Sequence, residues 1–208
     1  MAEIFYIGGS PCSGKSTVAE MLAKKYGFQY FKQDDYLETY IDRGVQEGHE
    51  LFRKISHMSM EEMWMRPPAV LCAEEIALYE VMFSYSVNDI SALPKGYAII
   101  AEGAGFMPDL VKRINVDKLH YICIVPTKEF QVRMYTKREW ISEYLSDCSN
   151  QNKAFENWME RDALFAETVL REAKDLGYAS LVVDGLKSIE ANFAAVEGVF
   201  QLYNTVQV

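Results

Sequence analysis

Residues 9–16 carry the feature that most constrains how this 208-residue chain folds. The pattern G-x-x-x-x-G-K-[ST] is met there by Gly9, Ser10, Pro11, Cys12, Ser13, Gly14, Lys15 and Ser16. An apolar run precedes the pattern and helical periodicity follows it. Glycines let the backbone curl so that successive N–H groups converge on an anion, and the helix N-terminus adds partial positive charge. The sequence therefore predicts a phosphate-binding loop between a buried strand and a helix.

The predicted loop has a defined chemistry. Lys15 is expected to reach the β- and γ-phosphates of a bound nucleotide, and the Ser16 hydroxyl is expected to ligate magnesium. We expect the whole motif and Thr17 to contact the nucleotide. Cys12 has two interpretations: a thiol with a lowered pKa at a helix N-terminus, or an unconstrained loop position. A glycine-rich turn that merely contains Lys-Ser remains the structural alternative for the motif.

Short apolar runs alternate with helical periodicity along the chain. Such runs are typical of parallel strands buried on both faces. They lie at residues 4–7, 29–32, 97–101, 120–125 and 180–183. The alternation predicts an α/β fold, a three-layer P-loop NTPase fold with a five-stranded parallel sheet. A first helix is expected from Lys15 to a cap at Gly27, and a closing helix carries Ile189, Phe193, Val196, Phe200 and Tyr203.

Residues 39–95 interrupt this alternation. We interpret them as a helical substrate-binding insertion within a single domain over residues 1–208, with a helix at residues 69–83 after the Pro67-Pro68 pair. The formal net charge of −9 argues against nucleic-acid binding, which needs clustered Lys and Arg.

Targeting and metal signals are lacking in the sequence. No apolar run approaches the roughly 18 to 20 residues that span a bilayer, and the N-terminus has no signal-peptide pattern. We therefore expect a cytoplasmic protein with no membrane partner. Four cysteines and three histidines show no ligand spacing, so no protein-held transition metal is predicted.

Acidic residues follow two of the predicted strands. Asp34 and Asp35, followed by Tyr36, come directly after the second strand, and Glu102 follows the third. Strand ends line the ligand crevice of this fold. A kinase needs a carboxylate beside magnesium that orients the acceptor hydroxyl and accepts its proton. Because successive strand residues point to opposite sides, only one of Asp34 and Asp35 is expected in this role. We expect the pair and Tyr36 to contact the acceptor; an Asp-rich turn that caps a helix is the alternative.

A basic segment follows the fourth predicted strand. Thr127 is expected to cap a helix over residues 127–145, on which Arg133 and Lys137 share one face beside Arg138. A polar stretch then leads to a helix with Arg161. We interpret residues 127–161 as a lid that places cations over the transferred phosphoryl group: Arg133 for catalysis, Lys137 and Arg138 for the nucleotide, and Arg161 for the acceptor. Solvated helix charges would give the same pattern.

Three short elements resemble one group of P-loop small-molecule kinases, the nicotinamide riboside kinase and uridine kinase branch. Residues 31–36 are similar to its Q-D-D-[FY] element, residues 99–103 to its apolar strand ending in E-G, and residues 183–185 to its last strand and D-G turn. The resemblance implies that Asp34 is the base, that Glu102 lies near magnesium, and that Asp184 and Gly185 lie near the adenine. It does not extend to the insertion, so the acceptor is not carried over.

The combined interpretation is a kinase that uses ATP and Mg²⁺ to phosphorylate a hydroxyl of an unidentified small molecule, for which a nucleoside is one candidate. Its alternative is a P-loop regulatory ATPase or switch protein without a metabolite acceptor. A kinase acting on RNA or on a nucleotide sugar is disfavoured by the acidic balance. The oligomeric state is left open.

Overall fold

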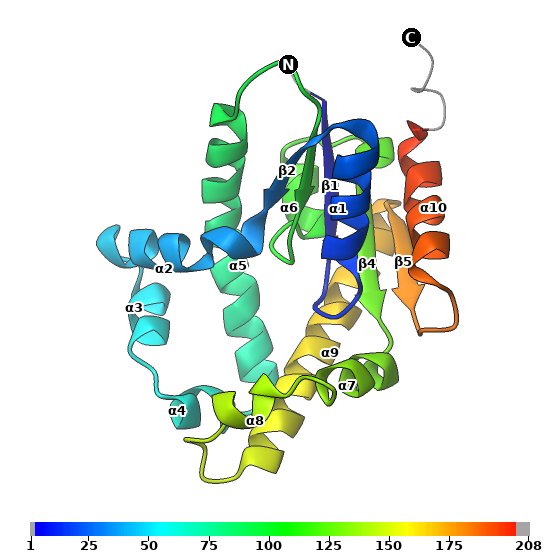
Figure 1. Ribbon diagram of the computed structural model, residues 1–208. Helices are drawn as coiled ribbons and strands as arrows, with labels where there is room; N and C mark the ends of the chain where they lie inside the picture. Colours follow the sequence, from blue (N-terminus) through cyan, green and yellow to red (C-terminus); the bar gives the residue numbers. More distant parts are fainter. Residues whose placement is uncertain (1–2, 203–208) are drawn as a thin grey trace.

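The computed structural model describes residues 3–202 and contains a parallel sheet of five strands in the order β2-β3-β1-β4-β5 (Figure 1). The predicted fold class is confirmed. The strands are β1 (Ile4–Gly9), β2 (Gln29–Lys32), β3 (Ile99–Glu102), β4 (Tyr121–Pro126) and β5 (Ala179–Val183).

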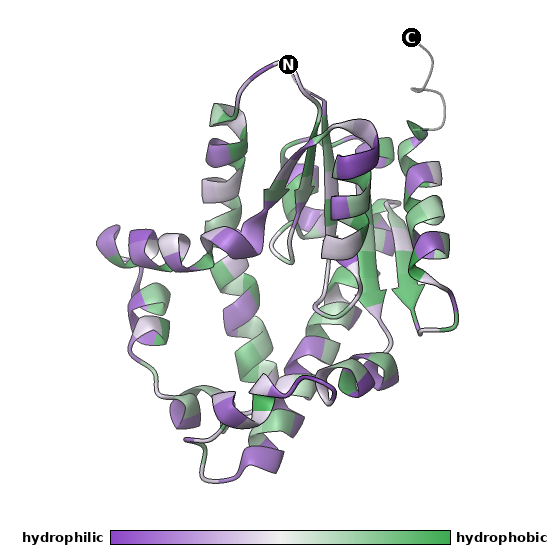
Figure 2. Ribbon diagram, viewed as in Figure 1, coloured by the Kyte–Doolittle hydropathy of each residue, from purple (hydrophilic) through white to green (hydrophobic). Residues whose placement is uncertain are grey.

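Helices cover both faces of the sheet because alternate strand residues point to opposite sides. Tyr6 belongs to one apolar cluster, while its neighbours Phe5 and Ile7 belong to the other. Apolar residues accordingly dominate β4 and β5 in Figure 2. The first face carries α5 (Pro68–Ala92), α6 (Pro108–Arg113) and α9 (Gln151–Leu176), and the second carries α1 (Lys15–Tyr26) and α10 (Ile189–Phe200).

The first and last helices lie where the sequence predicts them. Gly27 ends α1 in the left-handed conformation, with a φ of 67°. Ser188 caps the start of α10 through its side chain. Tyr203, expected on the closing helix, lies outside the described residues.

The segment after β2 is helical. It consists of a 3₁₀ turn, η1 (Gln33–Tyr36), followed by α2 (Leu37–Gln46), α3 (Glu50–Ser56), α4 (Met60–Trp64) and the long α5. The helix α5 extends nine residues beyond the predicted end at residue 83. The extension contains polar residues, so the apolar pattern did not predict it. One of them, Ser86, is buried, and its hydroxyl donates to the Met82 carbonyl. A second 3₁₀ turn, η2 (Lys118–His120), precedes β4.

The single helix predicted over residues 127–145 is wrong. Two short helices occupy this segment, α7 (Lys128–Tyr135) and α8 (Trp140–Tyr144). Thr127 caps α7 as predicted, accepting from the Phe130 amide. The helix ends where the Thr136 hydroxyl donates to the Arg133 carbonyl. Lys137 therefore lies in the break and does not share a helix face with Arg133.

Within residues 3–202, no helix is both long enough and apolar enough to cross a bilayer.

Gln33 fixes η1 against the sheet and α5. Its side chain is buried at 1% exposure; Nε2 donates to Ser86 Oγ over 2.9 Å, and Oε1 accepts from the Gly105 amide over 2.8 Å. A Cβ atom at Gly103 or Gly105 would lie 2.5 Å from the Gln33 side chain, so the segment after β3 needs glycine there. The following residue, Asp34, is held in place by these contacts.

We predict that Gln33→Ala lowers the free energy of unfolding by about 2 to 3 kcal/mol, because it leaves the buried Gly105 amide without a partner and removes the donor to the Ser86 hydroxyl. Urea denaturation measures the loss. The control is Gln46→Ala, at an exposed position of α2, with an expected change within about 0.5 kcal/mol. Equal losses of unfolding free energy in the two variants would show that Gln33 does not fix the position of η1.

Candidate active site

The loop between β1 and α1 has the conformation of an anion-binding loop. Gly9, Cys12 and Gly14 have positive φ values of 119°, 60° and 81°. Glycine is required at position 9, since a Cβ atom there would lie 1.9 Å from the Ile124 carbonyl oxygen of β4. Left-handed residues in a short loop turn successive amides toward one concavity. The loop leads directly into the N-terminus of α1.

The loop contains buried polar side chains whose hydrogen-bonding capacity is not fully used within the described residues. Lys15 is only 7% exposed, and its Nζ donates to the Ser10 carbonyl over 2.8 Å. The buried hydroxyls of Ser10 and Ser13 have no hydrogen-bond partner among residues 3–202. Phosphate oxygens accept hydrogen bonds from such groups, so the residues present fit a nucleotide phosphate chain.

Glu102 lies beside the loop because β3 pairs with β1, with Ile7 opposite Glu102 in the register. The carboxylate is 1% exposed, lies 3.9 Å from Lys15 Nζ, and accepts from the Tyr30 hydroxyl over 3.2 Å. Burial raises the pKa of Glu102; Lys15 and a hydrogen bond from Ser16 oppose this rise, and Asp34 adds to it.

The oxygen atoms of Ser16, Asp34 and Glu102 fit a hard divalent cation such as Mg²⁺. Within the described part of the chain, no group of three or more His, Cys, Asp or Glu residues could hold a metal ion. Magnesium typically takes one or two carboxylates and completes its shell with phosphate oxygens and water. The donor set therefore fits magnesium that arrives with a nucleotide.

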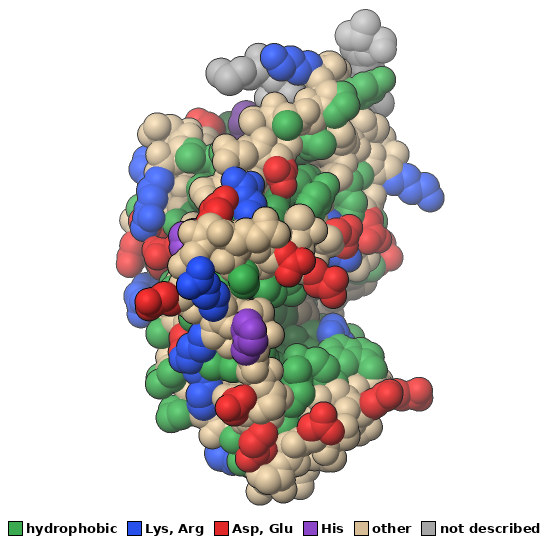
Figure 3. Space-filling model, turned by 90° about the vertical axis from the view of Figure 1, so that its left-hand side faces the viewer, with side chains coloured by type: hydrophobic (Ala, Val, Ile, Leu, Met, Phe, Trp, Pro, Cys, Tyr) green, Lys and Arg blue, Asp and Glu red, His purple; other side chains and the backbone are tan. Residues whose placement is uncertain are grey.

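A cavity of about 770 Å³ opens in front of the loop. The surface in Figure 3 is hollowed between an upper and a lower body. One side of the cavity is lined by residues 11–17 with Asp34 and Glu102, and the remaining walls come mainly from α2, α3, α4, α5, α7, α8 and α9. The cavity thus extends well beyond the phosphate-binding loop.

The two adjacent aspartates have different surroundings. Asp34 lines the cavity, whereas Asp35 does not and forms an ion pair of 3.6 Å with Lys32. Both lie in the 3₁₀ turn η1 and not in a strand, so the prediction that strand alternation separates them is wrong. The turn nevertheless gives the two side chains different surroundings. Tyr36 stacks on Phe31 and Tyr40, with ring centroids 4.9 and 5.7 Å away, and does not line the cavity.

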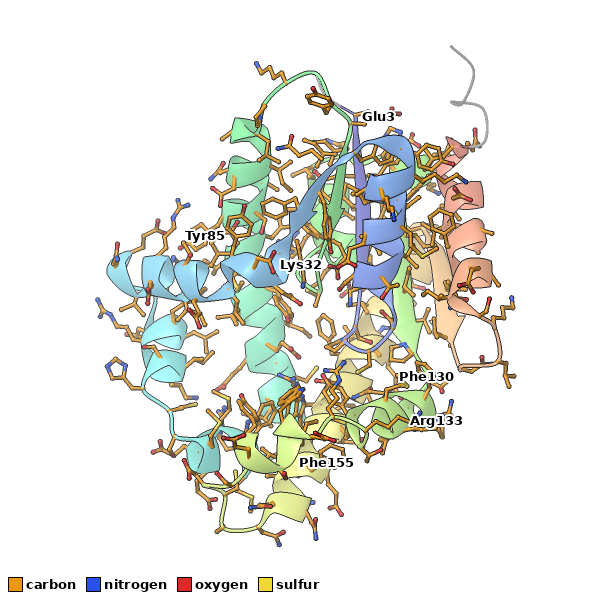
Figure 4. The ribbon with its side chains drawn as sticks, viewed as in Figure 1. Glu3, Lys32, Tyr85, Phe130, Arg133 and Phe155 are labelled. Atoms are coloured by element: carbon orange, nitrogen blue, oxygen red, sulfur yellow. The ribbon has the colours of Figure 1, made fainter. Side chains whose placement is uncertain are left out.

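Only two of the four predicted lid cations line the cavity, Arg138 and Arg161. Arg133 instead donates to the Asp184 carbonyl over 3.1 Å, with its guanidinium 5.2 Å from the Phe130 ring (Figure 4). It joins α7 to the turn after β5, and that turn, with Gly185, is not part of the cavity wall. The structure does not bring Arg133 or Lys137 to the predicted transfer site.

Arg138 links the segment after α7 to the phosphate-binding loop. Its Nη2 lies 3.2 Å from Cys12 Sγ, and its guanidinium lies 4.6 Å from the Tyr135 ring centroid. Burial raises the pKa of the Cys12 thiol, and the charge of Arg138 only partly opposes this. The interpretation of Cys12 as a thiol with a lowered pKa is therefore wrong.

Sequence reasoning missed the carboxylates around Arg161. Its Nη1 lies 3.2 Å from Glu75 Oε1, and its Nη2 lies 2.6 Å from Asp162 Oδ1. Burial alone would lower the pKa of Arg161, but the two carboxylates raise it; burial also raises the pKa of Glu75 and Asp162. The available sequence signal for this cluster is that Glu75 and Tyr79 lie one helical turn apart, on the same face of α5.

Aromatic rings form much of the lower wall. Trp64 and Trp158 stack with ring centroids 4.6 Å apart, and Tyr144 lies 5.4 Å from Trp158. The sequence has three tryptophans, and all of them, including Trp140, line the cavity. Tryptophan fluorescence therefore reports on this cavity.

Comparison with known proteins adds a family match. The model of the shikimate kinase family matches residues 11–75, less than half of the chain. This segment contains most of the loop motif, Asp34 and Glu75. No curated protein matches the sequence.

Solved structures resemble the chain at low sequence identity. TT1252 from Thermus thermophilus has a TM-score of 0.53 at 18% identity, covering 97% of this chain and 98% of that chain. Shikimate kinase from Acinetobacter baumannii in complex with shikimate has a TM-score of 0.46 at 13% identity, covering 100% of this chain and 97% of that chain. Shikimate kinase from Bacteroides thetaiotaomicron has a TM-score of 0.48 at 11% identity, covering 96% of this chain and 98% of that chain. The TT1252 likeness shows the fold, and nothing further rests on the two scores below 0.5.

The family match and the P-loop fold support an ATP-dependent small-molecule kinase. None of these three structures, nor the matching family, is named as a nicotinamide riboside kinase or uridine kinase.

We predict that Lys15→Ala weakens the binding of a magnesium–ATP analogue by about tenfold to a hundredfold, the equivalent of a charged hydrogen bond of about 1.5 to 3 kcal/mol. Titration of tryptophan fluorescence measures the affinity. The control is Lys24→Ala, at an exposed position of α1, which should bind like the original protein. Unchanged affinity in a folded Lys15→Ala variant would refute the assignment of the loop.

Proposed function

We propose that this chain transfers the γ-phosphoryl group of MgATP to a hydroxyl of a small molecule bound in the same cavity. One observation carries the proposal: Asp34, Lys15 and Glu102 face one cavity whose volume continues beyond the phosphate-binding loop. A site for hydrolysis alone needs only room for water. The match to a kinase family over residues 11–75 supports the same conclusion.

The nucleotide half of the site would be built by the loop. Its amides and the unpartnered Ser13 hydroxyl would donate to phosphate oxygens, and Lys15 would exchange the Ser10 carbonyl for a phosphate. Ser16 and Glu102 would hold magnesium, which supplies positive charge against the charge that develops on the phosphoryl oxygens. Ionisation of Glu102 is needed for this, and the cation would offset the burial that now raises its pKa.

The acceptor half would be built by the helices. Asp34 would orient the acceptor hydroxyl and take its proton late in the transfer. Arg138, which already contacts the loop at Cys12, is placed better than Arg133 to offset charge at the phosphoryl group. Movement of the segment over residues 127–161 would exclude water from the site.

A regulatory ATPase or switch remains the competing function. It would form ADP and inorganic phosphate without an acceptor, whereas a kinase forms ADP in proportion to the acceptor added. A nucleoside acceptor rests only on the likeness of residues 31–36, 99–103 and 183–185 to the riboside branch.

We predict that Asp34→Asn lowers kcat for acceptor-dependent ADP formation by about 10² to 10⁴, the range typical of a general base, while MgATP binding is retained. The matched control is Asp35→Asn, which removes a carboxylate that pairs with Lys32 outside the cavity. We expect its kcat to stay within about twofold, because that surface ion pair contributes little. The assay uses a small-molecule cell extract as acceptor source. A collapsed kcat in Asp35→Asn with a normal one in Asp34→Asn would reverse the assignment.

A further inference from the structure

The wall formed by α5 carries a buried carboxylate that the phosphoryl transfer does not use. Glu75 lines the cavity, and its side chain is 9% exposed. The Tyr79 hydroxyl donates to its Oε1 over 3.4 Å, whereas Oε2 has no hydrogen-bond partner among residues 3–202. Buried carboxylate oxygens usually have a donor. The Oε2 atom of Glu75 therefore lacks a hydrogen-bond donor, which a ligand in the cavity can provide.

Two carboxyl groups share one guanidinium around Glu75. From α9, Arg161 is shared between Glu75 and Asp162, and Asp162 is fully buried with its Oδ2 also without a partner in the described residues. One guanidinium thus faces two carboxylates. Burying an uncompensated negative charge is costly, so a ligand that brings a positive charge would be favoured.

The arginines of this half are already paired with carboxylates. Arg161 contacts Glu75 and Asp162, and Arg66 donates to Glu74 over 2.7 Å. Lys54, which is half exposed, binds the other oxygen of Glu74. Recognition of an acidic acceptor needs an arginine that is free to form a bidentate pair. An acceptor carboxylate that bound Arg161 or Arg66 would have to break one of these ion pairs and leave a protein carboxylate unpaired; Arg138, which also lines the cavity, lies at the phosphate-binding loop.

We propose that the acceptor is an amino alcohol, whose ammonium group binds Glu75 while its hydroxyl lies at Asp34. This inference rests on the proposed kinase function. Glu75 and Asp34 line the same cavity, so their separation is bounded by its volume of about 770 Å³. A small molecule can span that separation. The partly exposed rings of Trp140 and Tyr144 add π-faces that attract ammonium groups.

A panel of alcohols that differ in charge tests the proposal. Glucosamine, glucose and glucuronate form one set, and 2-amino-1,3-propanediol, glycerol and glycerate form another, each with an amine, a neutral and an acidic member. Binding is measured by tryptophan fluorescence in the presence of magnesium and a non-hydrolysable ATP analogue. We expect the amine of at least one set to bind at least tenfold more tightly than its neutral and acidic counterparts.

Glu75→Gln should lower the affinity for the amine at least tenfold, while leaving the affinity for the ATP analogue unchanged. The control is Glu172→Gln on α9, which also changes a carboxylate with a buried, unpartnered oxygen but at a position that does not line the cavity. It should bind the amine like the original protein. Thermal unfolding of both variants confirms that they are folded.

Tighter binding of the acidic members, no binding of any amine, or equal amine affinity in Glu75→Gln and the original protein would overturn the proposal. ADP formation is measured separately with each compound. Amine binding without phosphoryl transfer to any alcohol would refute the kinase function and leave the ammonium site standing. Transfer to an acidic or neutral alcohol alone would refute the amino alcohol and leave the kinase function standing.

Discussion

The parallel pairing of β3 with both β1 and β2 is the interaction on which the site depends. In this register Glu102 lies opposite Ile7 on one side and Lys32 on the other. The carboxyl ends of these three strands therefore lie side by side. There the phosphate-binding loop, Glu102 and the turn that carries Asp34 are neighbours. Strand ends at such an edge form the ligand crevice of α/β folds. A slip of one residue would turn Glu102 to the other face of the sheet.

The cavity joins two walls of different origin. The sheet edge supplies groups suited to phosphate and magnesium, and Gln33 fixes η1 to this edge through Gly105 and Ser86. The helices α5 and α9 supply the opposite wall, where Glu75 and Asp162 share Arg161. In the proposed function, the sheet edge would carry the phosphoryl chemistry and the helices would select the acceptor.

Features encoded by neighbouring residues could be predicted from the sequence. The loop, α1 with its cap at Gly27, and the five strands each have a local signal, a glycine pattern or an apolar run. The direction of Arg133 and the Glu75–Arg161 ion pair could not be predicted, because each depends on contact between segments far apart in the chain. The break between α7 and α8 was missed because helical periodicity continues through it.

The central claim, that one cavity carries MgATP and a hydroxyl acceptor, is tested most directly by mass spectrometry of a small-molecule cell extract incubated with the protein and MgATP. We expect at least one compound to gain a single phosphoryl group with the original protein and none to do so with Lys15→Ala. Steady release of inorganic phosphate from ATP, with no phosphorylated compound in the extract, would contradict it.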